Sequence, residues 1–246
     1  MWDIKLIRVG RINGNSYGSL LGHAPGEPVV MPMWMAAVTD GKTRIVIDTG
    51  IGKDIEDIVN GPEPNCMQDD SEDTERALFN ATLWKPEDVD IVINTHLHFD
   101  HCGSDGLFKN AKIYIQEKEL ESAKSPKGEF GFLYYEKYIE SVLKLQDQIC
   151  LVDGEKELFD GIALFQTRGH SEGHQSVMIK TNNGVVCFAG DCVPMIDNIT
   201  ENIPTSIYVD REACLRSFET IRKHADYIIP GHDYRMLNDE AEYYKL

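Results

Sequence analysis

Three histidines and an aspartate lie within six residues in the stretch Thr95-His96-Leu97-His98-Phe99-Asp100-His101. Imidazole nitrogens and carboxylate oxygens are the ligands that zinc and neighbouring divalent metals accept. The stretch follows residues 89–93, whose short, β-branched, apolar sequence predicts a buried strand. A loop at the end of a core strand can direct several side chains at one point. The spacing H-x-H-x-D-H therefore indicates a metal site rather than a histidine-rich surface turn.

Four further potential ligands share a local pattern of an apolar strand, a glycine and then a metal-binding side chain. His170 follows 164–169, Asp191 follows 185–190, His232 follows 228–231, and His174 comes directly after Gly173. Glycine lets the backbone turn tightly, so that the next side chain can point into a shared space. Together with the histidine-rich stretch, these residues predict one site built from the ends of several strands.

The elements that must position these residues read as alternating groups of strands and helices. The glycine-containing pairs at 40–41 and 183–184 predict hairpin turns, and Asp210 is the expected N-cap of a helix. This order predicts two similar halves that pack sheet against sheet, with helices outside. We expect strands at 3–9, 33–39, 43–48, 89–93, 112–115, 148–152, 158–167, 175–180, 185–189 and 226–230, and helices at 76–83, 117–123, 130–143 and 211–224.

Three stretches allow more than one interpretation. The segment Met31-Pro32-Met33-Trp34-Met35 is either ordinary strand packing or an apolar wall of a substrate pocket. The acidic residues 68–75 are interpreted as a solvated helix start, since negative charge is favourable there, and not as a metal site. Cys102 and Cys192 each follow a candidate ligand, and they either fill space or take a liganding or redox-sensitive role.

Composition and charge narrow the class of protein. The chain has 246 residues, a formal net charge of −17 and a pI near 4.8, which disfavours nucleic acid as a partner. It shows neither a signal peptide nor a membrane-spanning run, so we expect a cytoplasmic protein whose six cysteines are reduced thiols. It also contains no linker or internal repeat, so we expect residues 1–246 to form a single domain.

These motifs resemble those of the metallo-β-lactamase superfamily of binuclear metal hydrolases over nearly the whole chain. The matching elements are the strand end at 48–50, Thr95 to His101, residues 169–174, Gly190-Asp191 and Gly231-His232. Within the superfamily, the chain is most similar to N-acyl homoserine lactonases and 4-pyridoxolactonase. The resemblance implies an α/β fold, namely a four-layer αβ/βα sandwich.

The resemblance also implies a set of metal ligands. His96, His98 and His170 would bind a first ion, while Asp100, His101 and His232 would bind a second. Asp191 would bridge the two ions. His174 and Asp48 match supporting positions that orient ligands and do not bind metal themselves. The implied cofactor is a pair of divalent ions, with zinc as the first candidate and manganese, iron and cobalt as alternatives.

The implied activity is the opening of a lactone ring by a hydroxide that bridges the two ions and attacks the carbonyl. Asp100 would deliver the proton to the leaving alkoxide, and Asp191 would hold the two ions together. The expected partner is a small molecule, a lactone with an apolar portion, with no nucleic acid and no membrane. The oligomeric state stays open, with a homodimer among the candidates.

The chain departs from the lactonase pattern at Pro194. In lactonases a tyrosine three residues after the bridging aspartate binds the substrate, whereas proline offers no donor here. Tyr208, Tyr234 or a water would have to replace it, or the substrate would differ. An alternative is therefore the same chemistry on an amide, an ester or a thioester, as in glyoxalase II. Redox chemistry on iron and a purely structural metal site are weaker alternatives.

Overall fold

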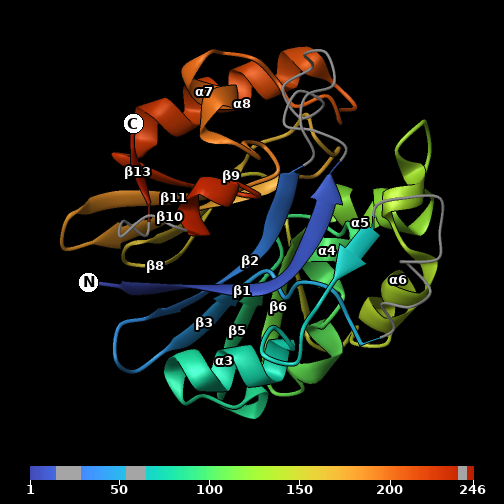
Figure 1. Ribbon diagram of the computed structural model, residues 1–246, viewed down its shortest axis with the longest axis vertical. Coiled ribbons are helices and arrows are strands. Elements are labelled where there is room, and N and C mark those ends of the chain that lie inside the picture. Colours follow the sequence, from blue (N-terminus) through green and yellow to red (C-terminus); the bar gives the residue numbers. More distant parts are fainter. Residues whose placement is uncertain (15–28, 54–64, 238–242) are drawn as a thin grey trace.

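The computed structural model describes residues 1–14, 29–53, 65–237 and 243–246 of the chain. Its described strands form two mixed sheets (Figure 1). The first has the order β4-β1-β2-β3-β5-β6-β7, with β1 at Asp3–Gly14, β2 at Val29–Thr39, β3 at Arg44–Ile47, β4 at Asn65–Met67, β5 at Ile91–Ile93, β6 at Lys112–Gln116 and β7 at Ile149–Val152. The second has the order β13-β12-β11-β10-β9-β8, with β8 at Lys156–Phe159, β9 at Ile162–Gln166, β10 at Gln175–Thr181, β11 at Gly184–Gly190, β12 at Tyr227–Pro230 and β13 at Tyr244–Lys245.

Parallel pairing in each sheet brings together the strand ends that matter for the site. In the first sheet β3, β5, β6 and β7 pair in parallel, while β1 and β2 form a long antiparallel pair. In the second sheet β11 and β12 pair in parallel. The carboxyl ends of parallel neighbours lie at the same edge of a sheet, so the residues that follow β3, β5, β11 and β12 are placed close to one another.

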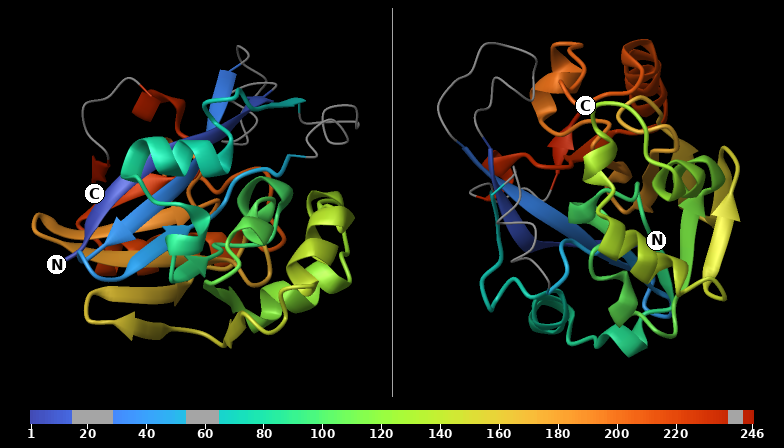
Figure 2. Two further views of the ribbon diagram at one scale, coloured as in Figure 1. Left: turned by 90° about the horizontal axis from the view of Figure 1, so that it is seen from below. Right: turned by 90° about the vertical axis from the view of Figure 1, so that its right-hand side faces the viewer.

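Helices cover the outer faces of both sheets (Figures 1 and 2). The described α-helices are α3 at Thr74–Thr82, α4 at Phe99–Cys102, α5 at Glu117–Lys124, α6 at Glu136–Leu143, α7 at Ile196–Thr200 and α8 at Arg211–His224, and the 3₁₀ helices are η1 at Pro86–Asp88, η2 at Asp105–Leu107, η3 at Gly131–Leu133 and η4 at Tyr234–Leu237. As predicted, Asp210 caps α8 by accepting a hydrogen bond from the Ala213 amide. None of the helices in the described segments combines the length and apolar content needed to cross a membrane.

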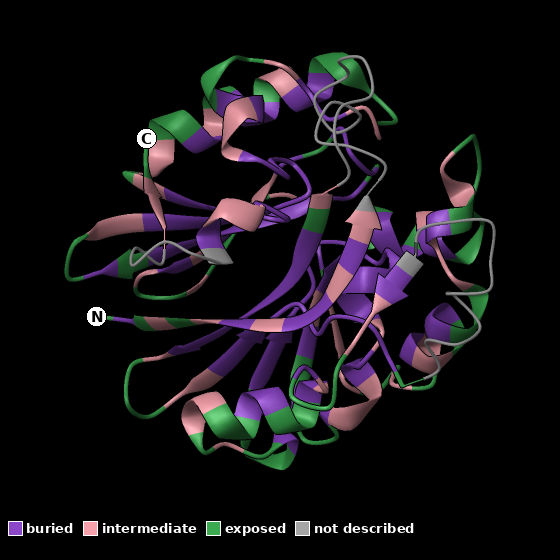
Figure 3. Ribbon diagram, viewed as in Figure 1, coloured by how far each residue is buried: buried purple, intermediate pink, exposed green. Residues whose placement is uncertain are grey.

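Three buried apolar clusters separate four layers. One lies between the first sheet and its helices, one between the two sheets, and one between the second sheet and α7 and α8. Strand β2 shows how the sequence divides between them, because side chains alternate across a strand. Met33 and Met35 face the helices, whereas Trp34 and Ala36 face the other sheet. The central strands β2, β3, β5 and β10 are accordingly buried on both faces over most of their length (Figure 3), and the predicted four-layer α/β sandwich is confirmed.

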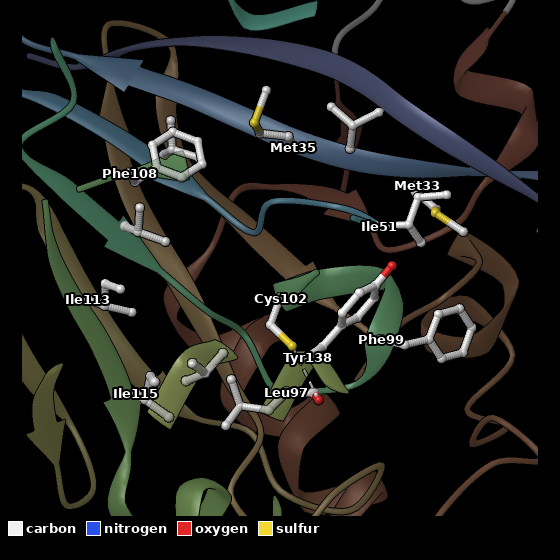
Figure 4. Close-up of a cluster of buried hydrophobic side chains, with 14 of the residues drawn as sticks. Met33, Met35, Ile51, Leu97, Phe99, Cys102, Phe108, Ile113, Ile115 and Tyr138 are labelled. Carbon is white, nitrogen blue, oxygen red and sulfur yellow. Dashed lines mark hydrogen bonds between the residues drawn. The ribbon is translucent and has the colours of Figure 1, made fainter. Parts of the chain in front are cut away.

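The methionines around Trp34 are core residues. Met33 and Met35 are buried beside Ile51 and Phe108 in the cluster under the helices (Figure 4). Trp34 is buried between the sheets with Ile45 and Ile93. Of the two interpretations of this stretch, the structure therefore supports strand packing and gives no support to a pocket wall.

Several predicted elements were wrong in their extent. The strands expected at 3–9 and 33–39 are longer, because β1 runs on to Gly14 and β2 begins at Val29. The strand expected at 158–167 is the hairpin of β8 and β9, because Gly161 adopts a φ of 87° and reverses the chain. The helix expected at 130–143 begins only at Glu136. Tyr135 before it is extended, with φ −66° and ψ 115°, so the preceding residues form the short helix η3 and a loop instead.

The acidic run was only partly the solvated helix start that the sequence predicts. Asp73 does cap α3, since its carboxylate accepts from the Arg76 amide. Glu72, however, is buried and forms ion pairs with Arg8 at 2.6 Å and Arg11 at 3.0 Å. Its charge therefore fastens the start of α3 to β1.

Candidate metal centre

The structure brings all seven predicted ligands together at the ends of strands. His96 and His98 lie in the loop after β5, and Asp100 and His101 follow on α4. His170 lies between β9 and β10, Asp191 follows β11 and His232 follows β12. The side chains between these ligands anchor the loop, because Leu97, Phe99 and Cys102 point into the buried cluster under the helices (Figure 4).

The ligand atoms form two buried groups. His96, His98 and His170 make the first group, and Asp100, His101, Asp191 and His232 make the second. Within each group the candidate ligand atoms lie within 4.8 Å of one another. Such spacing allows one cation to touch every member of a group.

The first group is a set of three imidazole nitrogens that face one another. His96 Nε2 lies 3.0 Å from His98 Nδ1. His170 Nε2 lies 3.2 Å from His96 Nε2 and 3.0 Å from His98 Nδ1. Burial, reinforced by the neighbouring imidazoles, lowers the pKa of His96 and His98 well below the usual value, and burial also lowers the pKa of His170. The rings are therefore neutral, which is the form that binds metal.

Asp191 stands between the two groups. Its Oδ2 lies 3.4 Å from His170 Nε2 in the first group. Its Oδ1 lies 3.0 Å from His232 Nε2 and 3.3 Å from His101 Nε2 in the second. One carboxylate thus directs one oxygen toward each group, as a bridging ligand requires.

The carboxylates and histidines of the second group shift one another's pKa values. Burial lowers the pKa of His101, but the carboxylates of Asp100, Asp191 and Asp48 outweigh it and raise that pKa well above the usual value. Burial likewise lowers the pKa of His232, but the Asp191 carboxylate outweighs burial, so the pKa of His232 is also raised. Burial alone would raise the pKa of Asp191, but the surrounding histidines hold it well below the usual value.

Hydrogen bonds behind the rings fix which nitrogen faces the centre. His170 Nδ1 donates to the Ile207 carbonyl, and His232 Nδ1 donates to the Pro32 carbonyl, each at 2.9 Å. His101 Nδ1 donates to Asp48 Oδ2 at 2.8 Å. In each ring the other nitrogen, Nε2, is left to face the ligand cluster, as the tautomer of a metal-binding histidine requires.

Asp48 supports the loop and the second group at once. Its Oδ1 accepts from the Thr95 amide at 2.7 Å, while its Oδ2 accepts from Thr95 Oγ1 and from His101. The residue has a φ of 55°, in the left-handed region that is uncommon outside glycine, and strain of this kind concentrates at functional sites. The supporting position predicted for Asp48 is thus occupied as expected.

Two glycines beside the ligands are required by close approach. A Cβ on Gly190 would lie 2.8 Å from His174 Nε2 and 2.9 Å from Thr95. A Cβ on Gly231 would lie 2.6 Å from Asp191 Oδ1. Gly231 therefore leaves room for the ligand Asp191, and Gly190 leaves room for two residues that support the ligands, His174 and Thr95.

The residues present fit a pair of divalent cations. His101 Nε2 and Asp191 Oδ1 are buried without a hydrogen-bond partner among the described residues, although buried polar atoms are normally satisfied. Both atoms point into the cluster, where they lie 3.3 Å from each other. Imidazole and carboxylate donors of this kind suit zinc and its neighbours, and the fold with its two groups fits a dinuclear site.

The remaining candidates have other roles in the structure. His174 donates from Nδ1 to Thr167 Oγ1 and accepts at Nε2 from the Cys192 amide, so it supports the residue after Asp191 and does not face the cluster. Cys102 and Cys192 are buried, and burial raises the pKa of both thiols well above the usual value. Neither belongs to a metal-binding group among the described residues, which supports space-filling roles.

Pro194, which stands where lactonases have a tyrosine, is buried. The Pro194 carbonyl accepts from the His232 amide at 2.9 Å, and so ties the two ligand loops together. Tyr208 follows Ile207, the residue that accepts from His170, and is 38% exposed. Tyr234 follows His232 by two residues and lies under the Arg235 guanidinium.

One aromatic neighbour escaped the sequence prediction. The Tyr134 ring lies edge-on to His98, with centroids 4.8 Å apart at 72°. It also borders a cavity of about 300 Å³ whose other walls include Lys118, Glu172 and Val209. Several aromatic residues lie between 130 and 138, and nothing in the sequence singles out this one.

Comparison with known proteins agrees with the geometry. The sequence matches the family model described as the metallo-beta-lactamase superfamily over residues 32–232, a range that contains all seven predicted ligands. An N-acyl homoserine lactonase from Bacillus cereus is 29% identical over 223 residues, which cover 85% of this chain and 84% of that protein. A probable metallo-hydrolase from Methanocaldococcus jannaschii is 35% identical over 148 residues, 60% of this chain and 59% of the relative. A solved N-acyl homoserine lactone hydrolase, with the product N-hexanoyl-L-homoserine bound at its catalytic metal centre, superposes with a TM-score of 0.81 at 26% identity, covering 96% of this chain and 94% of that one.

Proposed function

The chain belongs to the metallo-beta-lactamase superfamily, and we propose that it is a metal-dependent hydrolase that opens lactone rings. The observation that carries the proposal is the position of Asp191, whose two oxygens face two separate groups of buried ligand atoms. The similarity to homoserine lactonases over most of the chain supports the lactone as substrate.

We propose a residue-by-residue assignment of the ligands. His96, His98 and His170 hold the first ion. Asp100, His101 and His232 hold the second, and Asp191 is shared. Zinc is the first candidate because three neutral imidazoles and a carboxylate suit it, with manganese, iron and cobalt as alternatives that the same donors accept.

When bound, two divalent ions supply a water of lowered pKa as nucleophile and polarise the carbonyl that it attacks. The chain's own residues then orient and move protons. Asp100 Oδ2 lies 3.5 Å from His101 Nε2 and 3.4 Å from His232 Nε2, beside the reacting centre. From there its carboxylate takes up the proton of the attacking water and delivers it to the ring oxygen that leaves. The product is a hydroxy acid, formed without a covalent enzyme intermediate.

We propose that the part of the substrate that does not react is apolar. Tyr208 and Val209 are 38% and 47% exposed, and the Val209 amide donates to the Gly169 carbonyl at 2.7 Å, next to His170. This backbone contact brings residues 208 and 209 next to the loop that carries His170, where an acyl or ring substituent of the substrate would lie against them. Their apolar surface would gain from covering by such a group.

Pro194 supports an alternative within the same chemistry. Without the tyrosine that lactonases use at this position, the site has one donor fewer for the substrate carbonyl or leaving oxygen. The same metals would then act on an amide, an ester other than a lactone, or a thioester.

Hydrolysis assays on purified, metal-loaded protein separate these alternatives. The panels are N-acyl homoserine lactones and other lactones, cyclic and open-chain amides, open-chain esters, and thioesters. The proposal expects the highest kcat/KM on a lactone and complete loss of activity in Asp191→Asn. A protein that leaves every lactone intact while it cleaves a thioester rapidly would refute the assignment of substrate, but not that of the metals.

A further inference from the structure

A buried glutamate on α5 lies at the centre of three segments that surround the first ligand group. Glu119 is fully buried, and its carboxylate accepts four hydrogen bonds. Oε1 accepts from the Leu97 amide and from Tyr134 Oη, each at 3.0 Å. Oε2 accepts from Ser171 Oγ at 2.6 Å and from the Gly173 amide at 3.1 Å.

Three of these four donors are adjacent to a predicted ligand of the first ion. Leu97 lies between His96 and His98 in the chain, and Ser171 follows His170 directly. The Tyr134 ring lies against the His98 ring. One carboxylate thus holds the two loops that supply all three imidazoles of the first group, although these loops are more than seventy residues apart, as the separation of His170 from His96 shows.

The approach of α5 to the second of these loops depends on a glycine. A Cβ on Gly173 would lie only 2.1 Å from the Glu119 backbone nitrogen and 2.6 Å from its Cα. No side chain fits in that space. The contact between the start of α5 and the loop at 170–174 is therefore specified by both partners, the glutamate and the glycine.

We propose that Glu119 is the positioning residue for the first metal ion, as Asp48 is for the second. It fixes the distance between the loop that carries His96 and His98 and the loop that carries His170. Among its described hydrogen-bond donors, none belongs to Asp100, His101, Asp191 or His232. Its effect should accordingly fall on one ion only. The inference rests on the proposed metal binding.

Glu119→Gln is the sharpest test because it keeps the volume of the side chain. An amide has one acceptor oxygen and one NH₂ group. In one orientation the NH₂ faces the Leu97 amide, and in the other it faces the Gly173 amide. Backbone N–H groups can only donate, so either orientation breaks the hydrogen bond to one of the two loops. The matched control is Glu72→Gln, which alters another buried glutamate that pairs with Arg8 and Arg11 and contacts neither loop in the described structure.

The measurement is titration of chelator-stripped, full-length protein with Zn²⁺ against a chromophoric chelator, with Co²⁺ absorption to distinguish the two sites. Wild type is expected to bind two ions. Glu119→Gln should bind one of them about 10–100-fold more weakly, the size of effect seen for groups that orient ligands, and the other with little change. Glu72→Gln should bind both normally.

Equal affinities for both ions in Glu119→Gln and wild type would overturn the inference. If Glu119→Gln does not fold, Ser171→Ala tests the inference instead. This variant removes the hydrogen bond from Ser171 Oγ to Glu119 and leaves the charge of Glu119 unchanged. If Ser171→Ala binds one of the two ions several-fold more weakly than wild type does, the inference is supported. Unchanged affinity for both ions overturns it. A wild type that binds no metal overturns the inference together with the proposed function. A wild type that binds two ions and cleaves no lactone overturns the proposed substrate alone.

Discussion

Asp105 lies behind the site and gives a prediction whose size follows from the structure. Its carboxyl is buried, and its Oδ1 accepts from Thr49 Oγ1 at 2.8 Å and from Asn94 Nδ2 at 3.1 Å. Its Oδ2 has no hydrogen-bond partner among the described residues. Burial raises the pKa of Asp105 to about 7, against an ordinary value of 3.8. In Asp105→Asn the amide oxygen can keep both hydrogen bonds, and the NH₂ group takes the place of the unpartnered oxygen without being able to ionise.

The sign follows from proton binding. Between pH 3.8 and about 7 the native state holds a proton that the unfolded state has lost, so the free energy of unfolding of wild type falls as pH rises through this window. The slope from this one group is about 1.4 kcal/mol per pH unit. The side chain in Asp105→Asn cannot ionise, so the free energy of unfolding of this variant lacks the pH dependence that Asp105 causes. Relative to wild type, its free energy of unfolding should therefore rise by about 2.6 kcal/mol between pH 5 and pH 8.

Urea denaturation of both proteins at pH 5, 6, 7 and 8 measures this difference. A chelator present throughout keeps metal loss at low pH from contributing, and all other titrating groups cancel in the comparison. The expected result is a gap that widens in favour of the variant and levels off above pH 7. A gap that stays constant within about 0.5 kcal/mol across the range would show that Asp105 is already ionised at pH 5, and would refute the reasoning.

Three further predictions concern metal binding. In Asp48→Asn an NH₂ group can face His101 Nδ1 and reverse the tautomer of that ring. Chelator competition should therefore show that the second ion binds about 10–100-fold more weakly. Unchanged affinity would contradict the role of Asp48. Elemental analysis should find that His170→Ala loses an ion that His174→Ala keeps, because the ring nitrogens of His174 form hydrogen bonds with Thr167 and Cys192. Equal losses would make His174 a ligand. The raised pKa values of His101 and His232 mean that metal displaces protons from them, so affinity should increase with pH and calorimetry in buffers of different ionisation enthalpy should detect proton release near neutrality. Binding that neither releases protons nor varies with pH would contradict the protonated metal-free state.

The sequence was most informative where the chemistry is local. The three histidines and the aspartate after β5 are close in the chain, and an apolar strand with a glycine precedes Asp191 and His232. These patterns depend on neighbouring residues, so periodicity and spacing show them directly. The cap at Asp210 was predictable for the same reason.

The residues that escaped prediction act across large separations. Glu119 receives backbone hydrogen bonds from Leu97 and Gly173, which are 22 and 54 residues away, and a backbone donor leaves no mark on the sequence. Asp105 likewise accepts a hydrogen bond from Thr49, which is 56 residues away. Glu72 looked like one more exposed acid until the fold placed Arg8 and Arg11 beside it. Tertiary contacts decided each of these cases, and local pattern could not.

Anomalous diffraction from a crystal grown with excess Zn²⁺ would test the central assignment most directly, because it locates the ions without reference to activity. The assignment predicts two peaks about 3.5–4 Å apart, with Asp191 contributing one oxygen to each. Three histidines, His96, His98 and His170, should surround one peak, and Asp100, His101 and His232 the other. A single peak, or two peaks that share no ligand, would contradict it.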